Sequence, residues 1–304
     1  MAGCLENQVV LVTGAGGGIG REVALLAAKE GAAVVVNDLG VSTDGEGNNA
    51  GPAHDVVAEI KAFGGRAVAN TDSITDATAA EGMVRQAVDT FGRLDAVVNN
   101  AGFLRDRIFH KMSHDDWNSI VQVHLTGYWN VSRAAATFFR EAERGNFVHF
   151  TSTSGLVGNY GQANYAAAKL GVVGLSKSIA LDMQRYNVRS NCIAPFAWSR
   201  LVGTIPTDTP EERQRVDRIK EMTAAKIAPL SVFLASDLSK GVNGQIFGSR
   251  KNEIFLFSQP RPIRSVQRSD GWTPQQLADQ MLPAFKNSFF ALERSGDVFC
   301  WDPV

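Results

Sequence analysis

The chain has 304 residues, of which 44% are apolar, with 30 basic and 31 acidic side chains and a net charge of -1. This balance is typical of a globular protein and gives no electrostatic reason to expect nucleic acid or an anionic membrane as a partner. No apolar run approaches the roughly 20 residues that a membrane span needs. A strand-like run directly follows MAGCLENQ, so no secretory signal is expected. Cys4, Cys192 and Cys300 are widely spaced, which predicts free thiols and a cytoplasmic location.

The first part of the chain, NQVVLVTGAGGGIGREVALLAAKEGAAVVVND, reads as strand, glycine-rich turn, helix and second strand. Apolar runs without alternation predict strands that helices cover on both faces. The rhythm continues as a helix at 54–65, a strand at 66–72, a helix at 77–92, a strand at 94–102, one long helix at 113–143, a strand at 145–155, a helix at 163–187 and a strand at 188–195. This alternation predicts a Rossmann-type doubly wound parallel α/β sheet, which residues 1–248 form as a single domain.

Three segments depart from this rhythm. Residues 40–53 are rich in Gly and Asn and predict a flexible loop. Residues 201–220 carry prolines and charges and are a candidate lid beside the site. Residues 249–304 form a C-terminal extension that we expect to pack on or near the core. Within it, Thr273 and Pro274 predict a helix N-cap and first helical residue.

The extension also contains an apolar stripe at helical spacing, formed by Leu277, Met281, Phe285 and Phe289. We expect this stripe to pack and the Met and Phe residues of the extension to join the core. A ligand lid is the alternative.

The turn TGAGGGIG fits the pattern TGxxxGxG with Gly14, Gly18 and Gly20. Glycines at these positions let a pyrophosphate approach the backbone at a helix N-terminus. Asp38 ends the second strand, where a carboxylate can accept hydrogen bonds from an adenosine ribose and repel a 2′-phosphate. The turn and Asp38 together predict a dinucleotide site that prefers NAD. A solvated turn residue is the alternative for Asp38.

Tyr165 and Lys169 are four residues apart in a segment of high helix propensity, so they share one helix face. A free phenol has a pKa of about 10, and a nearby ammonium lowers it. The pair is therefore suited to passing a proton to a carbonyl or taking one from an alcohol. Tyr160 has no such partner and is expected to be a loop residue beside the pocket.

TGAGGGIG, NNAG at 99–102, and Ser152 followed thirteen residues later by the first residue of YAAAK together resemble the short-chain dehydrogenase/reductase family over about residues 7–248. The resemblance implies that Ser152 binds the substrate oxygen and that Lys169 also holds the nicotinamide ribose. It further implies an adenine contact from Asp72. The cofactor-binding residues predicted by motif and resemblance together are Gly14, Gly18, Ile19, Gly20, Asp38, Asp72, Asn99, Ala101, Gly102, Tyr165, Lys169 and Pro195.

His124 stands where the family usually has an Asn in N-x-x-G. The resemblance implies that it supports a water-linked proton relay, with a ring that titrates near neutrality. This His, NNAGFLRDRIF, GNYGQANYAAAKLG and IAPFAWSR resemble one subgroup, the (3R)-hydroxyacyl-CoA dehydrogenase unit of peroxisomal multifunctional enzyme type 2, also described as a 17β-hydroxysteroid dehydrogenase.

The subgroup implies NAD-dependent oxidation of a 3-hydroxyacyl-CoA, with a bulky or steroid-like acyl chain, to the 3-ketoacyl-CoA. It also implies a homodimer or homotetramer. The alternatives are a hydroxysteroid dehydrogenase acting on free steroid, an NADPH ketoreductase, and a catalytically silent dinucleotide sensor.

Two further groups of residues have competing interpretations. His110 and His114 are four apart, but Ser113 before acidic residues is better explained as a helix N-cap, and no metal is expected. Arg105 and Arg107 are candidates for contacts with CoA phosphates, and solvated loop charges are an equal alternative.

Overall fold

A computed structural model of the chain describes residues 3–40, 47, 50–197 and 209–304. Most of the predicted loop at 40–53 and the first part of the predicted lid at 201–220 therefore lie outside the described residues. The rest of the predicted lid forms helix α8, Pro210–Lys220.

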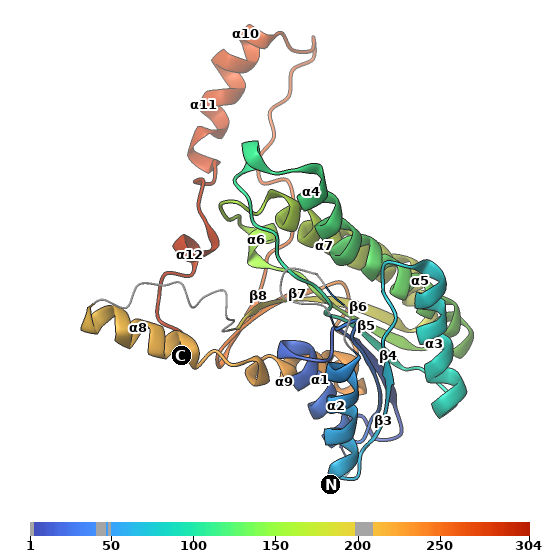
Figure 1. The fold of residues 1–304 in the computed structure, drawn as a ribbon. Helices are drawn as coiled ribbons and strands as arrows, with labels where there is room; N and C mark the ends of the chain where they lie inside the picture. The colour runs from blue at the N-terminus through green and yellow to red at the C-terminus, as the bar shows by residue number, and fades with distance from the viewer. Residues whose placement is uncertain (1–2, 41–46, 48–49, 198–208) are drawn as a thin grey trace.

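The described residues build one sheet of eight strands in the order β3-β2-β1-β4-β5-β6-β7-β8 (Figure 1). The strands are β1 Val9–Thr13, β2 Ala33–Asn37, β3 Arg66–Asn70, β4 Ala96–Asn99, β5 Gly145–Phe150, β6 Val188–Phe196, β7 Ile246–Arg250 and β8 Glu253–Leu256. All neighbours run parallel except β7 and β8. The doubly wound parallel sheet is confirmed, and the strand order reverses between β1 and β4. The predicted boundary after residue 248 lies within β7, and β8 extends the same sheet.

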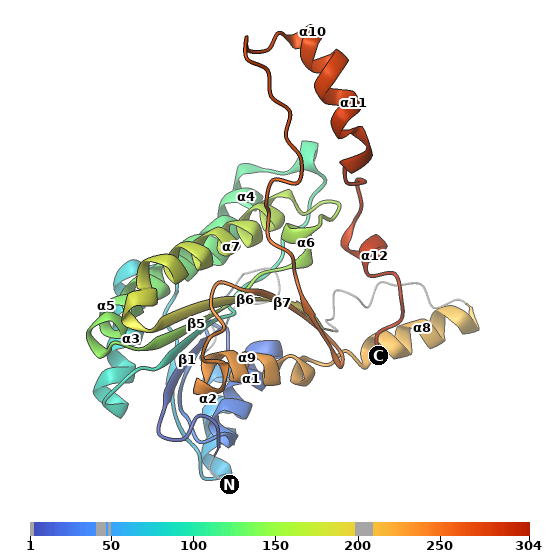
Figure 2. The same ribbon diagram turned by 180° about the vertical axis from the view of Figure 1, so that it is seen from behind.

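Helices cover both faces of this sheet (Figures 1 and 2). One layer contains α1 Gly18–Lys29, α2 Gly51–Ala62 and α9 Ala228–Ala235, and the other contains α3 Ala77–Phe91, α5 Tyr128–Ala142 and α7 Ala163–Met183. Alternate residues of a strand enter different cores: Val10 and Val12 belong to one cluster, and Val9 and Leu11 to the other. Burial on both sides explains why these strands are apolar without alternation.

The predicted long helix at 113–143 is interrupted. It consists of α4 His114–Val121, a π-helical stretch Gln122–Gly127, and α5. A π-helical stretch widens the turn and re-aims the side chains within it, and such stretches are frequent at functional sites. His124 lies inside this stretch.

The C-terminal extension is only partly packed on the core. Besides β8 it contains α10 Pro274–Gln276, a π-helical stretch Leu277–Met281, α11 Leu282–Phe285 and α12 Ser295–Val298. The segment from α10 to α11 extends away from the sheet, whereas α12 returns to it (Figures 1 and 2). At α12, the backbone N–H of Ser295 donates to Gly158 O at 2.9 Å, and the ring of Phe299 contacts Phe196 with a centroid separation of 4.7 Å.

Thr273 caps α10 as predicted, with its side chain accepting from the backbone N–H of Gln276. Phe257 packs against the core as predicted, but the prediction is wrong for the stripe from Leu277 to Phe289. Leu277, Met281 and Phe285 are half-buried, and Phe289 is exposed. The physical reason is the connection: residues 257–273 form no helix or strand and carry the following helix away from the sheet.

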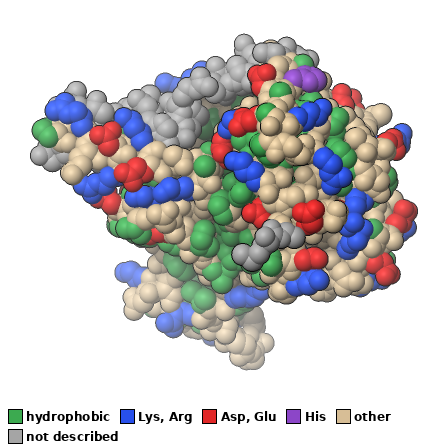
Figure 3. Space-filling view, turned by 90° about the horizontal axis from the view of Figure 1, so that it is seen from below, with side chains coloured by type: hydrophobic (Ala, Val, Ile, Leu, Met, Phe, Trp, Pro, Cys, Tyr) green, Lys and Arg blue, Asp and Glu red, His purple; other side chains and the backbone are tan. Residues whose placement is uncertain are grey.

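Among the described residues, no helix combines the length and apolar character needed to cross a membrane. On the face seen in Figure 3, basic and acidic side chains are interspersed, and neither sign forms a continuous patch.

Candidate functional site

A cleft of about 1050 Å³ lies at the carboxyl ends of β1, β2, β4 and β6. This is where the strand order reverses, the usual ligand site of an open α/β sheet. The predicted cofactor residues that line the cleft are Gly14, Gly18, Ile19, Asp38, Asp72, Ala101, Gly102 and Pro195.

The glycine turn allows two close backbone approaches. Gly14 has a φ of 63°, and a Cβ there would lie 2.6 Å from Ala101 Cα. A Cβ on Gly20 would lie 2.1 Å from the carbonyl oxygen of Gly14. The absence of a side chain at Gly20 thus lets α1 pack directly against the turn. Gly20 itself is not among the residues that line the cleft.

Asp38 is fixed at the end of β2 by two backbone donors. Its Oδ2 accepts from Gly16 N and its Oδ1 from Gly40 N, both at 2.7 Å. The carboxylate thus ties the glycine turn to the second strand and faces the cleft. It retains lone pairs for further donors, because each carboxylate oxygen can accept two hydrogen bonds.

Asp72 is held by Asn37 and Asn70, the last residues of the neighbouring strands β2 and β3. Asn70 Nδ2 donates to Asp72 Oδ2 at 2.9 Å, and Asn37 Nδ2 donates to Asp72 O at 2.9 Å. Asn37 also donates to Asn70 Oδ1 at 2.8 Å. This network sets the position of Asp72 on the cleft wall.

The two asparagines of NNAG point in different directions. Asn99 is fully buried, and its Nδ2 contacts Ser132 Oγ at 3.0 Å and His149 Nδ1 at 3.2 Å. Asn99 therefore supports the sheet and does not line the cleft. Asn100 lines it instead and donates to Thr13 O at 3.1 Å and Gly14 O at 3.0 Å. Sequence reasoning missed Asn100, because only the strand's pleat decides which Asn faces outward.

The residues of this cleft fit a dinucleotide. The glycines leave room that a Cβ would fill, the turn precedes the N-terminus of α1, and a carboxylate ends β2. Backbone N–H groups at a helix N-terminus are suited to a pyrophosphate. The cleft's volume and its extension from Asp72 to Pro195 leave space for both halves of the molecule.

Ser152, Tyr165 and Lys169 come together after β5. Ser152 caps the short helix α6, Thr153–Leu156, and its Oγ accepts from Ser154 N at 3.1 Å. Lys169 is buried, and its Nζ lies 5.7 Å from the centroid of the Tyr165 ring. The same Nζ donates to Phe150 O at 2.6 Å and to Tyr128 OH at 3.1 Å.

Burial shifts the pKa values of this pair in opposite directions. It raises the pKa of Tyr165 to about 12, opposed by a hydrogen bond with Ser152 and assisted by the negative charge of Asp106. It lowers the pKa of Lys169 to about 7. The pKa of Tyr165 is therefore raised, and the expectation of a lowered pKa beside Lys169 is wrong. Desolvation of the phenolate is the largest cause of the shift in the pKa of Tyr165, and burial also makes Lys169 less basic.

His124 connects the cleft to this trio. Its Nε2 donates to Phe103 O at 2.7 Å, and its ring meets the Tyr165 ring edge-on at 5.1 Å between centroids. A Cβ on Gly102 would lie 2.1 Å from His124 Cε1, which explains the glycine. Burial, and then the charge of Lys169, hold the pKa of His124 well below its usual value, so the predicted titration near neutrality is wrong.

Four residues were predicted to be catalytic, and Ser152, Tyr165 and Lys169 among them lie beside the cleft. Among the described residues, its lining includes Gly102 and Phe103 but not Ser152, Tyr165 or Lys169. His124 bridges the two groups, since it contacts both Phe103 and Tyr165.

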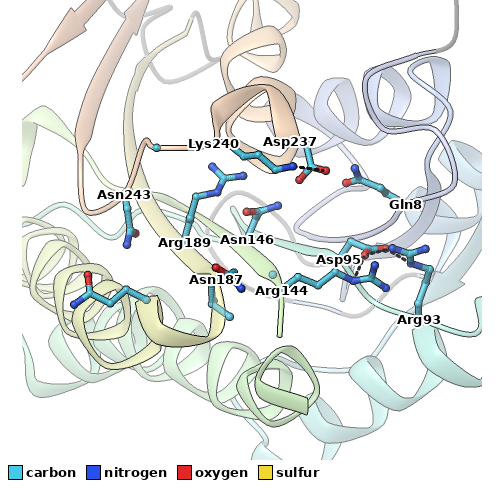
Figure 4. A pocket seen from close by; sticks show the side chains of 14 residues that line it. Gln8, Arg93, Asp95, Arg144, Asn146, Asn187, Arg189, Asp237, Lys240 and Asn243 are labelled. Carbon is cyan, nitrogen blue, oxygen red and sulfur yellow. Dashed lines mark hydrogen bonds and ion pairs between the residues drawn. The ribbon is translucent and has the colours of Figure 1, made fainter. Parts of the chain in front are cut away.

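A second cavity, of about 540 Å³, lies at the opposite ends of the strands (Figure 4). Its cations are engaged: Arg93 and Arg144 pair with the buried Asp95, Lys240 pairs with Asp237, and Arg189 donates to backbone carbonyls. Asp95 also accepts from Val9 N at 2.9 Å. These contacts hold strand beginnings together, and we assign this cavity a structural role.

Other predicted features have clear places in the structure. Ser113 caps α4 in a capping box with Asp116, as predicted. Arg105 lines the cleft and pairs with Asp115, while Tyr160 is exposed and its ring lies beneath Arg294. The three cysteines are free thiols. Across the described ranges, no group of three or more His, Cys, Asp or Glu side chains could hold a metal ion.

Comparison with known proteins agrees with this geometry. The short chain dehydrogenase family model matches residues 8–202. The chain is 42% identical to mouse peroxisomal multifunctional enzyme type 2, covering 90% of this chain but only 36% of that enzyme. It is 37% identical to a hydroxyacyl-CoA dehydrogenase of Mycobacterium tuberculosis, covering 90% and 87% of the two chains.

Among solved structures, a short chain dehydrogenase from Mycobacterium avium aligns with a TM-score of 0.82 and 36% identity, over 95% of this chain and 98% of that one. The match extends over nearly the whole length of both chains, so it includes most of the C-terminal extension. The chain therefore belongs to the short chain dehydrogenase family, oxidoreductases that act on CH–OH groups with nicotinamide dinucleotide cofactors.

Proposed function

We propose that this protein oxidises the 3-hydroxyl of a (3R)-hydroxyacyl-CoA to the 3-ketoacyl-CoA with NAD, in a reversible reaction. The observation that carries the proposal is the placement of Ser152, Tyr165 and Lys169 beside a cleft that fits a dinucleotide. The acyl-CoA part is supported by similarity to a relative named hydroxyacyl-CoA dehydrogenase, which this chain covers over 87% of its length.

The roles of the three side chains follow from their chemistry. A bound nicotinamide dinucleotide would accept the hydride that leaves the carbon carrying the substrate hydroxyl. Tyr165 takes the proton of the substrate hydroxyl, and the Ser152 hydroxyl holds the substrate oxygen. Lys169 places an ammonium beside the phenol and favours the phenolate when it is charged. His124, neutral and buried, holds the Phe103 backbone and the edge of the Tyr165 ring; its part in a proton relay stays a proposal.

The raised pKa of Tyr165 gives the reaction a direction of pH dependence. With a pKa of about 12, the residue is a protonated phenol near neutrality, ready to donate to a ketone. Oxidation needs the phenolate, so its rate is expected to rise with pH, while reduction of the ketone falls.

A substrate screen separates this proposal from its rivals. Purified protein with NAD is incubated with 3-hydroxyacyl-CoA thioesters of both configurations and several chain lengths, free steroid alcohols and simple secondary alcohols. We expect NADH formation with the (3R)-thioesters and at least about tenfold lower kcat/KM with the others, equivalent to about 1.4 kcal/mol. Turnover of free steroids alone favours a hydroxysteroid dehydrogenase. No turnover over the whole panel, with NAD bound, favours a dinucleotide sensor.

The preference for NAD over NADP is proposed from Asp38. Its charge lies on the cleft wall and repels a 2′-phosphate. Asp38→Asn removes the charge and one of the two oxygens that accept from Gly16 N and Gly40 N. Because that loss affects both dinucleotides alike, we expect the ratio of NADP to NAD dissociation constants to fall about tenfold, equivalent to about 1.4 kcal/mol. Asp55→Asn, an exposed carboxylate on α2, makes the same charge change and is expected to leave the ratio unchanged. An NADP-preferring wild-type protein contradicts the proposal and favours a ketoreductase.

We also propose that the protein forms a homodimer or homotetramer. The extension presents apolar side chains to solvent, with Phe290 90% exposed and Leu282 46% exposed. Apolar surface on a projecting segment is typical of a contact with another chain. Sedimentation of the full chain tests this, and a species of 32.7 kDa alone would contradict it.

A cytoplasmic location is proposed from the free thiols. The mouse relative is named as peroxisomal, so that organelle is the alternative. Microscopy of the tagged protein in its own cells distinguishes the two compartments.

A further inference from the structure

We propose that Tyr128 is a positioning residue whose hydroxyl holds the Lys169 ammonium in place beside the Tyr165 phenol. This inference rests on the proposed function, because it concerns the same proton transfer. Tyr128 directly follows the motif that runs from His124 to Gly127 but is not part of it, and no motif in the sequence pairs it with Lys169.

The geometry places Tyr128 against Lys169 in two ways. Tyr128 is the first residue of α5, directly after the π-helical stretch, and its side chain is fully buried. Its hydroxyl accepts from Lys169 Nζ at 3.1 Å, and the same nitrogen lies 4.7 Å from the centroid of its ring. Both contacts favour the charged form of the lysine, through a hydrogen bond to the oxygen and through attraction to the ring.

The two hydrogen bonds of Lys169 Nζ use two of the three hydrogens of its ammonium and so fix its position. Lys169 Nζ has three hydrogens when charged. One donates to Phe150 O at 2.6 Å and one to Tyr128 OH. The two acceptors come from β5 and α5, so they fix the nitrogen from two elements and leave one N–H for a ligand in the neighbouring site.

The surroundings of Lys169 provide little other compensation for its charge. The titratable groups that face it are Tyr165 on its own helix α7, Tyr128 on α5, His124 in the π-helical stretch, His149 on β5 and Cys192 on β6. Burial lowers the pKa of His149 to about 3 and raises that of Cys192 to about 12, so both are neutral near pH 7. Burial also raises the pKa of Tyr128 well above its usual value.

Among the described residues, the titratable groups that face the Lys169 ammonium thus include no carboxylate. A buried charge without an ion partner depends on neutral acceptors. The Phe150 carbonyl is part of the backbone and is present in any sequence. Tyr128 OH is the acceptor that this chain's side chains supply, and its loss should make Lys169 less basic and the Tyr165 phenolate harder to form.

The experiment compares Tyr128→Phe with the wild-type enzyme in the direction of alcohol oxidation. The variant keeps the ring and removes only the hydroxyl. Loss of a hydrogen bond to a charged group predicts that the rising limb of the kcat against pH profile moves up by about 0.5 to 1 pH unit. At a fixed pH on the rising limb, kcat of the variant should be about three- to tenfold below that of wild type. The dissociation constant of NADH should change less than about twofold.

Tyr186→Phe is the matched control, because Tyr186 is a partly buried tyrosine in the 3-10 turn Gln184–Tyr186 that follows α7, outside the site. It is expected to leave the profile unchanged. A purely structural role for Tyr128 lowers kcat or the midpoint of thermal unfolding without moving the pH limb, and that result overturns the proposal.

Two further measurements keep the test decisive. If Tyr128→Phe does not fold, 3-fluorotyrosine incorporated at position 128 keeps the hydroxyl but makes it a weaker acceptor. The limb should then move in the same direction, and no movement overturns the proposal. Tyr165→Phe separates the two hypotheses: full turnover in that variant overturns the proposed function, whereas lost turnover together with an unshifted Tyr128→Phe profile overturns only the role of Tyr128.

Discussion

Tyr165→Phe is expected to lose nearly all turnover while still binding NADH. The phenol is the acid and base of the proposed reaction, and removing such a group typically lowers rates by about 10² to 10⁴. The ring remains, so its edge-on contact with His124 is preserved. The measurements are kcat with the best substrate of the screen and NADH binding by fluorescence.

The control for this variant is Tyr160→Phe, in the same segment of the chain. Tyr160 is 76% exposed, and its ring rather than its hydroxyl faces Arg294. We expect its kcat to stay within about twofold of wild type, as for a surface change away from structural features. A Tyr165→Phe enzyme with more than about one tenth of wild-type turnover would contradict the assignment of Tyr165 as the proton-transfer residue.

Gly20→Ala is expected to weaken dinucleotide binding and to destabilise the fold. The added Cβ would lie 2.1 Å from Gly14 O, a backbone atom that cannot rotate away. A Cβ on Gly14 would lie 2.6 Å from Ala101 Cα, so the turn cannot relieve the clash by moving toward Ala101 and must shift into the cleft that Gly17 and Gly18 line. We expect a loss of about 1–3 kcal/mol in the free energy of unfolding, as for overpacking in a core. NADH affinity should fall at least about tenfold through displacement of the turn.

Gly82→Ala provides the matched control for the same chemical change. Gly82 is an exposed residue of α3, and a Cβ there meets nothing within 4 Å. Alanine is the better helix former by about 0.8–1.0 kcal/mol, so this variant should be equally or more stable and bind NADH normally. Wild-type NADH affinity in a folded Gly20→Ala protein would show that the close approach of α1 to the turn is not required.

Much of the fold was predictable because its signals are local. A strand buried on both faces must be apolar at successive positions, and Val9–Val12 are divided between the two cores in this way. The glycine turn is likewise local, since its steric requirement falls on a few neighbouring residues. The pairing of Tyr165 with Lys169 follows from helix spacing alone.

The predictions that failed depend on contacts between distant segments. The boundary predicted after residue 248 lies within β7, which pairs with β6 on one side and β8 on the other. The stripe Leu277–Phe289 has the periodicity of a packing helix, but periodicity does not state whether another element lies opposite. The segment after β8 carries it away from the sheet.

By itself, the sequence determined the doubly wound sheet and the glycine turn, and it carried the proposal of Tyr165 over Tyr160, because each depends on residue type and short-range spacing. Only the tertiary structure decided which asparagine of NNAG faces the cleft, how burial sets the pKa values of Tyr165 and Lys169, and that Tyr128 reaches the lysine from another helix. Burial and hydrogen-bond partners arise from segments far apart in the chain, and the pattern within one segment does not contain them.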